Sequence, residues 1–110
     1  MNIIKEDLYV AFMPEKDTNF NDFFKLFSKE INQYKSNNVI VDLSKLTVST
    51  TKLLQFEKIL EKKVELGTSF VVIDTEVDLD EIPDELIVVP TFQEAIDIID
   101  MDEMTRSLDF

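Results

Sequence analysis

Apolar residues recur along the chain at two spacings, which predict alternating helices and strands. Between residues 20 and 34 they follow one another every three or four positions, as on the buried face of a helix. This stripe consists of Phe20, Phe23, Phe24, Phe27, Ile31 and Tyr34. The same spacing predicts a second helix with Leu53, Phe56, Leu60 and Val64 inward, and a third with Phe92, Ala95, Ile96 and Ile99 inward.

Residues at the ends of these helices support their limits. Thr18 or Asn19 can cap the first helix, because a short polar side chain there accepts from a free backbone N–H. Gly67 is the only glycine in the chain and is suited to a left-handed C-cap after the second helix. Thr91 and Glu94 have the spacing of a capping box at the start of the third.

Short apolar runs, several rich in β-branched residues, predict strands at 3–4, 8–13, 39–43, 69–73 and 86–89. The first two flank the polar residues 5–7 and predict a hairpin. The resulting order is β-β-α-β-α-β-β-α, which predicts an α/β fold with a mostly parallel central sheet and helices packed on it in two or three layers. We expect residues 1–110 to form a single domain, with a loosely ordered tail over 102–110.

The net charge of −12 is unevenly distributed along the chain. Residues 64–110 contain fourteen acidic residues and one basic residue, Arg106. Such a charge repels the phosphates of nucleic acids and anionic lipids and attracts basic protein surfaces. We therefore expect a protein partner with a basic surface, no nucleic acid and no membrane. A general solubility charge is the alternative interpretation, and a homo-oligomer is left open.

The chain contains no His and no Cys, so the commonest general base, thiolate nucleophile and transition-metal ligands are missing. We expect no catalytic residues, no metal site and no cofactor, and therefore a protein that is not an enzyme. Acids at 74–85 alternate as in an EF-hand loop, but Leu79 occupies the position of the required glycine. Without a long apolar stretch or a signal-like start, the protein is expected to be cytoplasmic.

Several features occur in a familiar order along nearly the whole chain: the hairpin, Val-Ile-Val-Asp-Leu-Ser-Lys-Leu at 39–46, a hydroxyl-rich turn into a helix, Leu-Gly at 66–67 before a strand, and Thr-Phe-Gln-Glu-Ala-Ile at 91–96. Together they resemble the STAS family, the fold of bacterial anti-sigma factor antagonists and of cytoplasmic domains of sulfate transporters. The resemblance implies a STAS-like domain that binds other proteins. The sequence is also similar to small STAS-like proteins sometimes labelled ribonuclease Z, although that nuclease family requires His ligands for zinc.

The functional motif of the family is Asp-Ser-Ser-Gly at the start of its second helix, where the second Ser is phosphorylated by a partner kinase. Ser49 stands here in place of the Asp and Lys52 in place of the Gly, and Thr51 is the nearest match to the phosphoacceptor. A phosphate at a helix N-terminus would meet free N–H groups and add up to about two negative charges. Ser and Thr at such a position are also ordinary helix caps.

The sequence favours a non-enzymatic, regulatory interaction module. Its candidate partner-binding residues are Ser49, Thr50, Thr51, Lys52, Asp78, Asp80 and Glu81. One alternative is an anti-sigma factor antagonist switched by phosphorylation of Thr51. A second alternative is an accessory subunit of an RNA-processing nuclease, without catalysis of its own.

Overall fold

The computed structural model of the protein describes residues 1–108, which form a five-stranded sheet and four helices. The strands are β1 (Asn2–Lys5), β2 (Val10–Met13), β3 (Val39–Asp42), β4 (Phe70–Ile73) and β5 (Ile87–Val89). The helices are α1 (Phe20–Glu30), α2 (Thr50–Leu53), α3 (Glu57–Glu65) and α4 (Phe92–Leu108). Three 3₁₀ turns accompany them: η1 (Ile31–Tyr34), η2 (Leu54–Phe56) and η3 (Leu79–Glu81).

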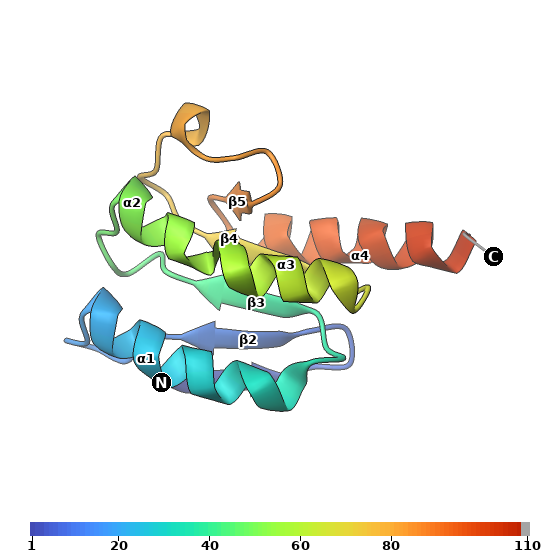
Figure 1. Cartoon of the computed structure of the whole chain (residues 1–110), viewed down its shortest axis with the longest axis horizontal. Helices are drawn as coiled ribbons and strands as arrows, with labels where there is room; N and C mark the ends of the chain where they lie inside the picture. The colour runs from blue at the N-terminus through green and yellow to red at the C-terminus, as the bar shows by residue number, and fades with distance from the viewer. Residues whose placement is uncertain (109–110) are drawn as a thin grey trace.

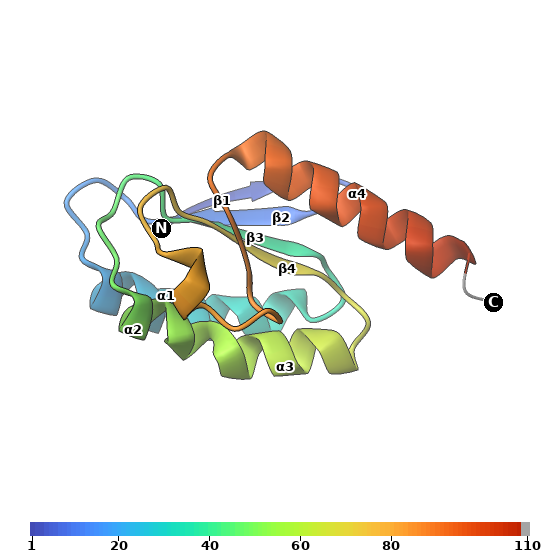
Figure 2. The same cartoon turned by 90° about the horizontal axis from the view of Figure 1, so that it is seen from above.

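The strands lie in the sheet in their sequence order, β1-β2-β3-β4-β5 (Figures 1 and 2). β1 runs antiparallel to β2 as the first half of a hairpin, and the other neighbouring strands pair in parallel. The predicted α/β fold with a mostly parallel sheet is therefore confirmed. Parallel strands require a long crossover, and residues 74–86 supply the one between β4 and β5 with η3 in place of a full helix.

Helices cover both faces of the sheet, so the fold has three layers (Figure 2). α1, α2 and α3 pack on one face, where Phe12, Val41 and Phe70 lie in the larger apolar cluster. α4 packs alone on the other face, where Ala95 and Ile99 meet Ala11, Ile40, Val71 and Ile73. The strands are apolar on both faces because each face is covered.

The phenylalanine stripe of the first helix belongs to the core, as predicted. Phe20, Phe23, Phe27 and Ile31 are buried, and Phe24 and Tyr34 pack partly buried against them. Phe27 lies at the centre of an aromatic cluster, with ring centroids 5.0 Å from Phe12, 5.7 Å from Phe56 and 6.2 Å from Phe70. The stripe is therefore occupied by the protein's own interior.

The predicted inner face of the second helix is wrong at its end. Leu53 and Phe56 are buried, but Val64 is 67% exposed and Lys63 is buried in its stead. The cause is the 3₁₀ turn η2, which lies between α2 and α3. A 3₁₀ turn winds more tightly than an α-helix, so three such residues rotate the following helix by roughly 60° more than three α-helical residues would. This added rotation turns Lys63 inward in place of Val64.

The helix ends have the predicted caps. Asn19 caps α1, and its side chain accepts from the N–H of Asp22 at 2.8 Å. Gly67 has φ +73° after α3, and the N–H groups of Gly67 and Thr68 donate to Val64 and Lys63, which is the Schellman arrangement. At α4, the Thr91 hydroxyl accepts from the N–H of Glu94 at 3.1 Å.

The expected loose tail is wrong for residues 102–108, which complete α4. Arg106 donates from Nη2 to Asn38 Oδ1 at 3.0 Å, to Ser69 Oγ at 3.2 Å and to Glu103 Oε1 at 2.7 Å. Ser69 in turn donates to Asp102 at 2.7 Å, and Asn38 to Glu103 at 2.8 Å. Hydrogen bonds from Asn38 and Arg106 lower the pKa of Glu103. This network holds the end of α4 to the residues that precede β3 and β4. Residues 109 and 110 lie outside the described part.

Candidate functional site

The hydroxyl-rich turn at residues 49–52 forms the start of α2. Ser49 is the N-cap, and its Oγ accepts from the N–H of Lys52 at 3.3 Å. Thr50 and Thr51 are the first two helical residues, and Thr51 is exposed. The Lys52 ammonium lies 5.9 Å from the centre of the Phe20 ring, so its side chain covers part of the aromatic cluster.

The acidic residues of the crossover between β4 and β5 surround η3. Asp78 caps this turn, and its carboxylate accepts from the N–H of Asp80 at 3.0 Å. Asp78, Asp80 and Glu81 are all exposed. The Thr50 hydroxyl donates to Glu81 Oε2 at 3.0 Å, although the two residues are 31 positions apart. This hydrogen bond brings the two predicted segments together.

We call the seven residues of these segments the rim surface: Ser49, Thr50, Thr51, Lys52, Asp78, Asp80 and Glu81. The rim surface lies beyond the carboxyl ends of the parallel strands, where β3 ends at Asp42 and β4 at Ile73 (Figure 1). Open α/β sheets commonly bind ligands at this edge, because the connecting loops are free to vary there. The site residues predicted from the sequence thus occupy one edge of the sheet.

Asp74 anchors the acidic crossover at the end of β4. Its side chain is buried, and Oδ1 accepts from the N–H of Glu76 at 3.1 Å. Oδ2 is buried without a hydrogen-bond partner. Burial raises the pKa of the Asp74 carboxyl, and the backbone N–H groups of Glu76 and Thr75 partly oppose this rise. The sequence did not distinguish this buried acid from the exposed acids that follow it.

The exposed acids of the crossover are not neutralised by basic side chains. Within residues 1–108, ion pairs form only between the Met1 amino group and Glu15 and between Arg106 and Glu103. The carboxylates of Asp78, Asp80 and Glu81 therefore present their charge to solvent. Such a field attracts cationic groups and is screened by salt.

Within residues 1–108, the side chains do not meet the needs of a metal site and the helices do not meet those of a membrane span. Across residues 1–108, no three side chains of His, Cys, Asp or Glu gather in a way that could hold a metal ion. No helix in this part of the chain combines the length and the apolar composition that a bilayer crossing requires.

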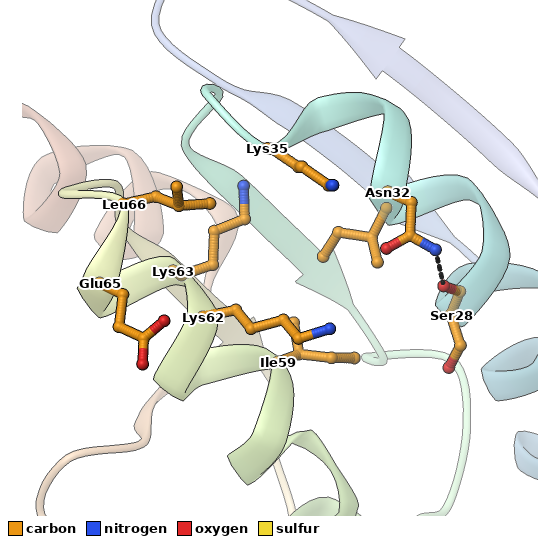
Figure 3. Close-up of a pocket in the computed structure, with 9 residues that line it drawn as sticks. Ser28, Asn32, Lys35, Ile59, Lys62, Lys63, Glu65 and Leu66 are labelled. Atoms are coloured by element: carbon orange, nitrogen blue, oxygen red, sulfur yellow. Dashed lines mark hydrogen bonds between the residues drawn. The ribbon is translucent and has the colours of Figure 1, made fainter.

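Lys63 is a functional candidate that the pattern of apolar residues does not indicate. It is only 3% exposed, and its ammonium donates to the backbone carbonyls of Tyr34 at 2.6 Å and Asn37 at 2.5 Å. Burial lowers the pKa of Lys63 to about 8. Because these carbonyls follow α1, Lys63 ties α3 to the turn that leads into β3 (Figure 3). A pattern of apolar positions cannot indicate that a lysine is buried.

Loss of the Ser49 side chain is expected to weaken the start of α2. Ser49→Ala should lower the free energy of unfolding by about 0.5–2 kcal/mol, because the N–H of Lys52 loses its acceptor. Thr51→Ala is the matched control and should change it by less than about 0.5 kcal/mol, since Thr51 is exposed. Urea unfolding measures both. An equal loss in the two variants would contradict the assignment of Ser49 as the cap.

Comparison with known proteins adds no family to this description. The chain matches no protein-family model, and it matches no curated protein. The STAS resemblance therefore stays a prediction.

Proposed function

We propose that this protein is a non-enzymatic interaction module whose rim surface binds a basic surface of a protein partner. The observation that carries the proposal is the hydrogen bond between Thr50 and Glu81. It joins a helix start to a set of exposed carboxylates that have no ion pair within residues 1–108. A surface of this kind suits Lys or Arg side chains, because they supply both charge and hydrogen-bond donors.

The non-enzymatic part of the proposal depends on side-chain chemistry. With no His and no Cys in the chain, acid–base or nucleophilic catalysis would depend on carboxylates, hydroxyls or amines. The carboxylates of the rim surface are exposed to solvent, an arrangement that suits the binding of cationic groups better than proton transfer. Binding is therefore the function that these residues support best.

We further propose that the domain is STAS-like in its finer arrangement and acts as a regulatory protein. The proposal is supported by the succession of strands and helices and by the hydroxyl-rich turn at the start of α2. Regulation through Thr51 is a second candidate. It is supported by one observation: Thr51 is exposed beside the Ser49 cap, where a kinase could reach its hydroxyl.

Neutralising the acids of the rim surface is expected to weaken partner binding. The triple variant Asp78→Asn, Asp80→Asn, Glu81→Gln removes three charges and should lower affinity on the order of tenfold at low salt. Each exposed ion pair contributes only modestly to the binding free energy, but the three contributions add. The partner is first captured from native lysate with the tagged wild-type chain and identified by mass spectrometry. Its affinity for purified variants is then measured by biolayer interferometry.

A matched control removes three exposed acids from α4 by Glu94→Gln, Asp97→Asn and Asp100→Asn. The control should keep the partner's affinity within about twofold, since it removes the same number of negative charges but leaves the rim surface intact. Equal weakening in both triple variants would show that net charge alone attracts the partner and would overturn the proposal.

In the same assay, loss of binding in Thr51→Glu with retention in Thr51→Ala would support the phosphorylation switch.

A further inference from the structure

A pocket opens between the end of the first helix and the C-terminal part of α3 (Figure 3). Its volume is about 460 Å³, within the range of small-molecule sites. The pocket is lined by Ser28, Ile31, Asn32, Lys35, Ile59, Lys62, Lys63, Glu65 and Leu66. It lies at the edge of the sheet where β3 begins, whereas the rim surface lies where β3 ends. The two sites are therefore separate.

The charge of this pocket differs from that of the protein as a whole. Lys35, Lys62 and Lys63 line it together with a single acid, Glu65, although the chain carries a net charge of −12. Figure 3 shows the lysine side chains extending from two elements, with Lys35 beyond η1 and the other two on α3. A local excess of positive charge in a concave site attracts anions even where the distant field is negative.

Lys63 contributes a buried ammonium beside the pocket. An ammonium has three N–H groups, and two of them are used by the carbonyls of Tyr34 and Asn37. Within residues 1–108, no acceptor pairs with the third. Because Lys63 is buried, this charge is less screened than that of an exposed lysine.

Apolar side chains complete the lining. Ile31, Ile59 and Leu66 contribute aliphatic surface to the same pocket, and Ser28 and Asn32 add short polar groups. Leu66 is 54% exposed, so its side chain is accessible to a bound ligand. Aliphatic walls together with three lysines in the lining match a ligand that has an anionic head and an apolar body.

We propose that this pocket binds a small organic anion with an aliphatic body, whose head is held by Lys35, Lys62 and Lys63. The head supplies an acceptor for the third N–H group of Lys63, and the body covers Ile31, Ile59 and Leu66. The proposal is independent of the partner that binds the rim surface.

Octanoate is the probe that tests this site. Added to the full-length ¹⁵N-labelled protein, it should shift the amide resonances of residues that line the pocket and saturate with a Kd on the order of 1 mM or tighter, as expected for a ligand of its size. The variant Lys35→Gln, Lys62→Gln should bind about tenfold more weakly. Both lysines are exposed, so the fold is expected to survive their replacement.

The control variant Lys16→Gln, Lys45→Gln removes two exposed lysines that do not line the pocket and should bind like the wild type. Octanol has the aliphatic body without the anionic head, and inorganic phosphate has the anionic charge without the body. Each alone should produce no saturable shift at the pocket. Equal binding of octanol or of inorganic phosphate would overturn the amphiphilic class. Absence of octanoate shifts at the pocket, or an equal loss of affinity in the control variant, would overturn the site itself.

Discussion

Replacing Phe27 with alanine is expected to lower the free energy of unfolding by about 3–5 kcal/mol. The Phe27 ring is fully buried and has ring centroids 5.0 Å from Phe12, 5.8 Å from Phe23 and 5.7 Å from Phe56. Its removal leaves a cavity between α1, the sheet and η2, which the surrounding rings fill only in part. Because small domains have a total stability of about 5–15 kcal/mol, partial unfolding at 37 °C is expected.

Urea unfolding monitored by circular dichroism measures this effect, and Phe23→Ala should behave similarly because Phe23 is also fully buried. Leu26→Ala is the matched control on the neighbouring position of α1. Leu26 is 49% exposed, so its truncation should cost less than about 1 kcal/mol. A Phe27→Ala variant as stable as Leu26→Ala would mean that the aromatic cluster is not the core of this fold.

The aromatic cluster also shows which parts of the fold local patterns can predict. The spacing of the phenylalanines is a property of one helix, and the buried face follows from it directly. The caps at Asn19 and Gly67 are equally local, since each depends on a few neighbouring residues. The predicted strands were recovered because runs such as Val39–Asp42 are apolar on both faces of a covered sheet.

Features that depend on distant contacts were predicted poorly. The last turns of α4 are polar, and their order comes from Asn38 and Ser69, which lie 68 and 37 positions from Arg106. Burial of Lys63 follows from the 3₁₀ turn η2, whose tighter winding no apolar pattern indicates. For the candidate site, the sequence predicted the members of the rim surface, but the contact between Thr50 and Glu81 and the burial of Asp74 required the tertiary fold.

Lys63→Met is expected to destabilise the fold, by an amount that grows with pH. Methionine keeps most of the aliphatic stem but donates nothing to the carbonyls of Tyr34 and Asn37. Loss of these donors should lower the free energy of unfolding by about 1–3 kcal/mol at pH 7. Guanidinium unfolding of both proteins across pH 7–10 measures the difference.

The pH dependence follows from the lowered pKa of Lys63, which burial brings to about 8 from 10.5. Between these values the unfolded chain binds more protons than the folded one, so raising the pH stabilises the fold. The contribution of Lys63 is therefore complete above the unfolded pKa and declines as the pH falls through the folded pKa. The neutral amine still has two N–H groups, which suffice for the two carbonyls.

The difference in stability between wild type and Lys63→Met should consequently grow by about 2 kcal/mol from pH 7.5 to pH 10. The other titratable groups are common to both proteins. They include Lys35, Lys62 and Glu65, which line the pocket beside Lys63. Lys62→Met is the control, because Lys62 is exposed and donates to neither of these carbonyls. A difference that shrinks as the pH rises would mean that the carbonyls of Tyr34 and Asn37 favour the ammonium more strongly than burial disfavours it.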